Sequence, residues 1–178
     1  LQNPSFESPA KPDAIPGWVH ARGPGVEVGV MRGAGFRSPS GLHVVSRPTA
    51  EGPAPIVWVR SAPLPVPSTG RLSLLVHLRA ANAAKQPTLR LAIEGKLDGR
   101  VKYWKANIGA SEDGQPVKPL SVEWSQFRFP VVDLPQSGLT DLRIGFDLMG
   151  EGDVWIDEVQ VFDLWFEENE RNELLKSI

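Results

Sequence analysis

The chain has 178 residues, a size at which a single domain with one buried core is the usual outcome. Its formal net charge of −2, without any clustered Lys/Arg stripe, argues against nucleic acid as a partner. The chain has no cysteine, which excludes disulfides, thiol nucleophiles and thiolate metal sites. It also has no apolar run of about 18 residues that could span a membrane.

The predicted elements are short strands bounded by Gly, Pro, Ser or Asp. In chain order, they are expected at 26–31, 42–46, 56–61, 71–80, 88–94, 101–108, 123–129, 142–148 and 153–162. Strict alternation of apolar and polar residues is clearest at 71–80, 88–94 and 142–148, so each of these strands is expected to bury one face against the core. The last strand changes phase, which predicts a β-bulge near Asp157.

Proline-rich stretches at 8–16, 48–55 and 62–69 predict ordered loops or edge coverings, and the polar stretch 109–119 predicts a flexible loop. After Asp163 the composition changes to acidic residues followed by Lys176, which predicts a helix with charges suited to its dipole. Two placements stay open for this helix. It either packs on the sandwich through Trp165 and Phe166 or leads into a longer stalk.

Many short strands with frequent turns and one terminal helix predict an all-β antiparallel sandwich over residues 1–163, followed by a helix or linker at 164–178. The chain starts without Met and ends within the predicted helix. From this we expect a segment of a longer multidomain protein, with neighbouring domains as its covalent partners.

Sequence motifs near the two ends resemble those of a known family. They are the run from Asn3 to Glu7, the Pro16-Gly17-Trp18 loop, the Ser40-Gly41 turn and a closing strand from Val154 to Val159. In this order they resemble carbohydrate-binding modules of the galactose-binding-like jelly roll, over the chain up to about Asp163. The resemblance implies a noncatalytic, glycan-binding module of a secreted or cell-surface bacterial protein. Fold alone does not set function, so a protein-interaction or structural spacer domain of the same fold is the alternative.

The resemblance also implies a structural calcium ion that ties the first strand to the last. Its acidic ligands would be Glu7 and Asp157, completed by backbone carbonyls around 38–41 and by water, because calcium takes six to eight oxygen ligands. The simpler alternative is that both carboxylates accept hydrogen bonds from loop amides and hold no metal.

A sugar-binding surface needs exposed aromatic rings beside polar side chains that form paired hydrogen bonds. The outward positions of the predicted strands supply these residue types, and they would share one face if the strands are neighbours. The candidate ligand-binding residues are Trp58, Arg60, His77, Arg79, Arg90 and Trp104. The alternative is an ordinary solvated sheet face.

Catalysis is not expected. The three histidines are separated by whole strands, and there is no Gly-x-Ser-x-Gly elbow, His-Glu-x-x-His pair or phosphate-binding glycine loop before a helix. A glycosidase would need two carboxylates across a cleft, and the sequence alone pairs none.

Overall fold

The computed structural model describes residues 1–7, 14–164 and 168–177. It contains two antiparallel five-stranded sheets and one short helix, which confirms the predicted all-β sandwich. The elements are β1 (Trp18–His20), β2 (Val26–Arg32), β3 (Ser40–Ser46), β4 (Val57–Ser61), β5 (Leu72–Ala80), β6 (Thr88–Leu97), β7 (Arg100–Gly109), β8 (Ser125–Val131), β9 (Leu139–Leu148), β10 (Gly152–Phe162) and α1 (Glu168–Lys176).

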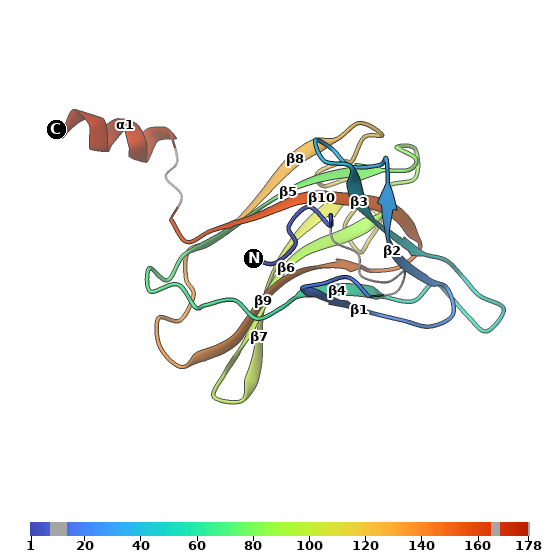
Figure 1. Cartoon of the computed structure of the whole chain (residues 1–178), viewed down its shortest axis with the longest axis horizontal. Coiled ribbons are helices and arrows are strands. Elements are labelled where there is room, and N and C mark those ends of the chain that lie inside the picture. The colour runs from blue at the N-terminus through green and yellow to red at the C-terminus, as the bar shows by residue number, and fades with distance from the viewer. Residues whose placement is uncertain (8–13, 165–167, 178) are drawn as a thin grey trace.

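Strand pairing joins segments that are distant in the sequence (Figure 1). The order β1-β4-β9-β6-β7 forms the first sheet, and the order β2-β3-β10-β5-β8 forms the second. The closing strand β10 therefore lies between β3 and β5, and β9 lies between β4 and β6. This arrangement decides which outward side chains become neighbours.

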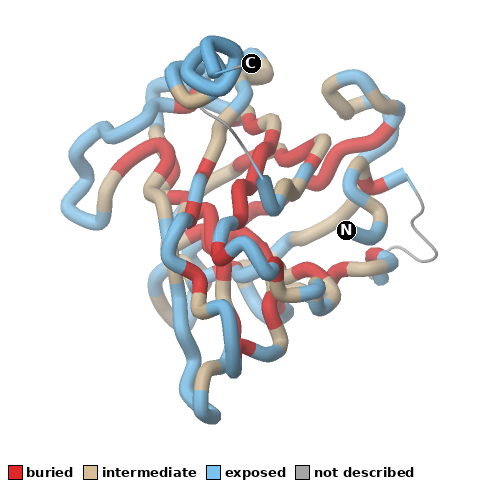
Figure 2. Tube along the Cα trace, turned by 90° about the vertical axis from the view of Figure 1, so that its left-hand side faces the viewer, coloured by how far each residue is buried: buried red, intermediate tan, exposed pale blue. Residues whose placement is uncertain are grey.

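The core lies between the two sheets, where buried apolar side chains of both sheets pack together. Figure 2 shows the buried positions in red along the chain. Leu74, Leu91 and Ile144 are among its fully buried side chains. Trp18 is buried as well and packs its ring against Phe6 and Phe146, with centroid distances of 5.4 and 6.1 Å. It therefore closes one part of the core, the packing role that its position after a Pro-Gly turn suggests.

The local predictions are confirmed to within a few residues at most strand ends, and the register of β10 shifts between Asp157 and Gln160, as a bulge requires. The three-residue strand β1 was not predicted, because it is too short to show alternation. The stretch 109–119 forms a hydrogen-bonded hairpin, in which Gly109 and Lys118 pair and the Ser111 N–H donates to the Gln115 carbonyl.

The predicted helix is present as α1, and none of its described residues is buried. It stands beside the sandwich in Figure 1, and Arg71 of the sandwich lies 3.8 Å from Glu170 of the helix. Trp165 and Phe166, through which the helix was predicted either to pack on the sandwich or, failing that, to lead into a stalk, lie outside the described residues. In the described part of the chain, no helix has the length and apolar character needed to cross a membrane.

Candidate functional site

The outer face of the first sheet carries two exposed aromatic rings. Trp58 on β4 is 41% exposed, and Tyr103 on β7 is 38% exposed. Trp58 points away from the core, because its chain neighbours Val57 and Val59 are both buried. Tyr103 points the same way, because its cross-strand partner is the outward-facing Glu94. Two aromatic rings thus flank the middle strands of this face.

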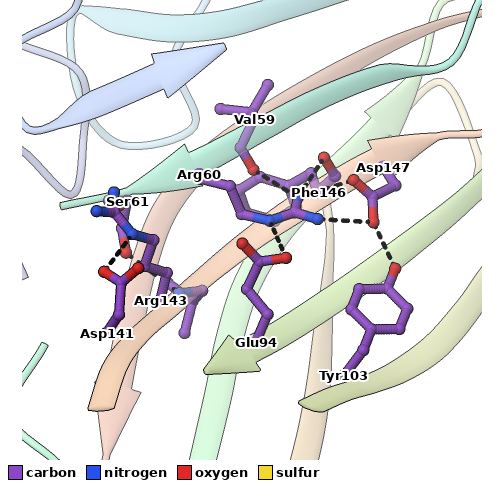
Figure 3. Close-up of polar contacts among 10 residues, drawn as sticks. Val59, Arg60, Ser61, Glu94, Tyr103, Asp141, Arg143, Phe146 and Asp147 are labelled. Atoms are coloured by element: carbon purple, nitrogen blue, oxygen red, sulfur yellow. Dashed lines mark hydrogen bonds and ion pairs between the residues drawn. The ribbon is translucent and has the colours of Figure 1, made fainter. Parts of the chain in front are cut away.

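A network centred on Arg60 lies on this face and includes Tyr103 (Figure 3). Its Nη1 and Nη2 donate to the two carboxylate oxygens of Asp147, at 2.7 and 3.1 Å, and its Nε lies 3.0 Å from Glu94 Oε2. The Tyr103 hydroxyl donates to the same Asp147 carboxylate. Bidentate pairing of this kind fixes the orientation of planar groups, so the network holds the face in one shape.

The network also shifts the ionisation of its members. Burial alone would lower the pKa of Arg60, but hydrogen bonds and charge attraction from Asp147 and Glu94 outweigh burial and raise that pKa. Burial, together with the hydrogen bond to Asp147, raises the pKa of Tyr103 to about 12. The Tyr103 hydroxyl therefore stays protonated and the guanidinium charged throughout the physiological range.

A row of cross-strand partners crosses this face. Trp58 pairs with Asp147, Asp147 pairs with Arg90, and Arg90 pairs with Asn107. The row runs over β4, β9, β6 and β7, with neighbouring strands about 4.8 Å apart. It combines an apolar ring with hydrogen-bond donors and acceptors, the two chemical features that a sugar requires.

Three of the six predicted ligand-binding residues lie on this face: Trp58, Arg60 and Arg90. The expectation that Trp104 joins them is wrong, because Trp104 pairs with the buried Ile93 and packs against the core. Tyr103, one residue earlier in β7, takes the place predicted for Trp104. The signal was present in β7, where the even positions at 104–108 are apolar and the odd positions at 103–107 are polar.

The other two predicted residues, His77 and Arg79, lie on β5 in the second sheet, so the six do not share one face. The His77 ring stacks on Phe36, with ring centroids 4.0 Å apart. The Arg79 guanidinium carbon lies 5.2 Å from the ring centroid of Trp124 and 4.8 Å from that of Trp155. These contacts are cation–π and ring-stacking interactions within the chain.

Comparison with family models and with curated proteins found no match. Among solved structures, the CBM22-1 xylan-binding domain of Paenibacillus barcinonensis Xyn10C is similar, with a TM-score of 0.57 and 14% identity, over 88% of this chain and 89% of that domain. The C-terminal family 22 carbohydrate-binding module of Clostridium thermocellum Xyn10B gives 0.58 and 18%, over 90% and 95% of the two chains. This chain therefore shares the β-sandwich jelly-roll fold of these modules.

A longer structure shows the same likeness. It contains the CBM22-1 and GH10 modules of C. thermocellum Xyn10B with xylohexaose, and it matches with a TM-score of 0.60 and 14% identity. The match covers 89% of this chain but only 27% of that one, so the jelly roll described here spans about a quarter of the longer protein. At these identities the likeness establishes the fold.

The jelly roll brings Glu7 and Asp157 to one loop. The Ser40 N–H donates to Glu7 Oε1 at 2.8 Å, while Asp157 Oδ2 accepts hydrogen bonds from the Phe36 N–H at 2.6 Å and from Ser38 Oγ at 2.9 Å. Asp157 is fully buried. The two carboxylates therefore fasten the loop before β3 to the first and last segments of the chain.

The same loop offers further oxygen atoms. A Cβ placed on Gly35 would lie 2.2 Å from the Ser38 carbonyl oxygen and 2.4 Å from that of Ser40, so both carbonyls converge on this glycine. In the described residues no group of three or more His, Asp or Glu side chains could hold a metal ion. Any cation near Glu7 and Asp157 would thus depend on backbone carbonyls, which are ligands that calcium accepts.

Proposed function

We propose that this domain is a noncatalytic carbohydrate-binding module that holds a polysaccharide against the outer face of the first sheet. The observation that carries the proposal is the placement of Trp58 and Tyr103, two exposed rings on one face, on either side of a fixed network of charged groups. Aromatic rings stack on the C–H faces of sugars, and the charged groups bond their hydroxyls.

The fold supports the same ligand class. The jelly rolls similar to this chain include a xylan-binding domain and a module studied together with xylohexaose. Their identity to this chain is 14% in both cases, so the individual sugar contacts cannot be transferred residue by residue. The choice of face here depends on the exposed rings of this chain.

The chemistry of the face favours binding without catalysis. A glycosidase needs one carboxylic acid that delivers a proton to the leaving group. Both Asp147 and Glu94 are instead engaged by the Arg60 guanidinium, so on this face their oxygen atoms point at a cation and not at a leaving group. We place the module in a larger secreted or cell-surface protein, with α1 leading to the next segment.

We also propose a structural calcium ion beside the loop at 35–40. Support comes from two carboxylates fastened to one loop and from the converging carbonyls of Ser38 and Ser40. Calcium would supply rigidity at this junction, with Glu7 and Asp157 as its charged ligands. It would take no part in sugar contacts, because these residues are not on the outer face of the first sheet.

Affinity electrophoresis and calorimetric titration against plant, algal and microbial polysaccharides test the sugar proposal. The Trp58→Ala and Tyr103→Ala variants should each weaken binding at least about tenfold, because each removes one ring that stacks on a sugar. Trp124→Ala is the matched control, because it removes a tryptophan outside this face. Parallel assays of reducing-sugar release should stay at background.

Two outcomes would contradict the proposal. Equal loss of binding in all three folded variants would show that the first sheet is not the binding face. A wild-type domain that binds no polysaccharide in the panel would favour the spacer or protein-interaction alternative.

A further inference from the structure

One ion cluster on the binding face differs from the others in which part of the chain carries its carboxylate. Arg60 and Arg143 pair with carboxylates carried by strands, at Asp147, Glu94 and Asp141. Arg90 and Lys105, on the adjacent strands β6 and β7, instead share a carboxylate carried by a loop. That carboxylate belongs to Glu112, in the hairpin between β7 and β8.

The geometry of this cluster is that of a carboxylate receptor. A single oxygen, Glu112 Oε1, accepts hydrogen bonds from Arg90 Nη2 and from Lys105 Nζ, the latter at 3.2 Å. Arg90 is also the cross-strand partner of Asp147, in the row that begins at Trp58. A polymer lying along this row would therefore reach Arg90 about two strand spacings, or about 10 Å, from the Trp58 strand, and Lys105 about one spacing further on.

Glu112 is the exchangeable member of the cluster. Its side chain is 56% exposed, whereas that of Arg90 is only 15% exposed. It sits in a tight turn in which the Gly114 N–H donates to the Ser111 carbonyl at 2.9 Å. Exposed ion pairs contribute little to stability, so a ligand carboxylate can replace this one without loss of the hairpin's own hydrogen bonds.

We propose that the Glu112 carboxylate occupies, from within the chain, the position where Arg90 and Lys105 bind a carboxylate of the ligand, so that the preferred polysaccharide contains uronic acid. This inference rests on the proposed function and names its ligand class. When Glu112 swings away, Arg90 and Lys105 face an incoming anion, and Arg90 keeps its hydrogen bond with the Tyr103 hydroxyl. Glu112 then competes with the ligand and reduces the affinity for acidic polymers.

Matched polymers test the inference. Glucuronoxylan and polygalacturonate are each titrated against the whole chain, alongside the same polymer after its carboxyl groups are reduced to alcohols. Glu112→Gln should bind the acidic forms roughly three- to tenfold more tightly than the wild type, and its affinity for the reduced forms should not change. The gain should shrink as salt is raised, because the contact is exposed.

Two variants control the result. Asp113→Asn removes the same charge from the same turn, but Asp113 bonds to Ser111 rather than to the sheet, so its affinities should match the wild type. Combining Glu112→Gln with Lys105→Gln should abolish the gain for acidic polymers. An equal gain in the Asp113→Asn variant would show a long-range charge effect and would overturn the inference.

The remaining outcomes separate this inference from the function it rests on. If Glu112→Gln changes neither polymer form, or both equally, while Trp58→Ala still weakens binding of the reduced forms, the carboxylate site is wrong and the sugar-binding face stands. If no form binds to any variant, both proposals fail.

Discussion

Arg60 on β4 and Gly145 on β9 are cross-strand partners, and the arginine side chain lies over the glycine on the outer face of the first sheet. A Cβ at Gly145 would meet the Val59 carbonyl oxygen at 2.0 Å and Arg60 Nη1 at 2.9 Å. The absence of a side chain at this position is therefore what allows Arg60 to lie flat and reach Asp147 and Glu94.

Gly145→Ala should destabilise the domain by at least about 2 kcal/mol, because the added methyl group overpacks a site bounded by backbone. Urea unfolding measures this change. Gly29→Ala is the matched control, since a Cβ at Gly29, also within a strand, would meet no atom within 4 Å. Equal stability of the two variants would show that Arg60 does not depend on the open space at Gly145.

The hydroxyl of Tyr103 should titrate near pH 12, well above its ordinary value of 10.0. Because Tyr103 is the only tyrosine in the chain, ultraviolet absorbance follows this group alone. In Asp147→Asn the midpoint should fall toward the ordinary value, since the carboxylate that opposes the phenolate is gone while burial remains. A midpoint that does not move would place the cause in burial alone.

His77 should titrate below its ordinary value of 6.5, because burial, opposed in part by Glu158 and assisted by Arg37, lowers its pKa. The folded state then binds this proton less tightly than the unfolded chain, so the contribution of His77 to stability is lost as pH falls below about 6.5. Ring proton chemical shifts followed by NMR give the midpoint. Glu158→Gln should lower it further, and a rise in that variant would contradict the assignment.

Calcium should raise the melting temperature relative to a chelator if the proposed ion binds. At a calcium concentration one hundred times the dissociation constant, one site adds about 2.7 kcal/mol of stability. Glu7→Gln should abolish most of this effect, whereas Glu51→Gln, at another exposed glutamate, should retain it. Identical melting in calcium and in chelator would leave Glu7 and Asp157 as hydrogen-bond acceptors for the loop.

Much of the proposed binding face could be predicted from the sequence, and the part that failed has a clear physical cause. The exposure of Trp58 and the outward direction of Arg60 and Arg90 follow from alternation within single strands. The inward direction of Trp104 was readable from Ala106 and Ile108, but the charged Lys102, which shares its parity in the strand, suggested the opposite. A one-residue change of parity moves a side chain to the other face of the sheet.

The sequence by itself determined the local features of this protein: where most strands begin and end, which side of most strands is dry, the bulge in the last strand and the acidic start of α1. These features depend on residues close together in the chain. Only the tertiary structure decided that β4, β9, β6 and β7 lie side by side, while β5 belongs to the opposite sheet. Antiparallel pairing joins distant segments through backbone hydrogen bonds that any residue except proline can donate. Side-chain patterns therefore specify which face of a strand points to the core, but not which strands pair with each other. The meeting of Trp58, Tyr103 and Asp147 on one face, away from His77 and Arg79, is a consequence of that pairing.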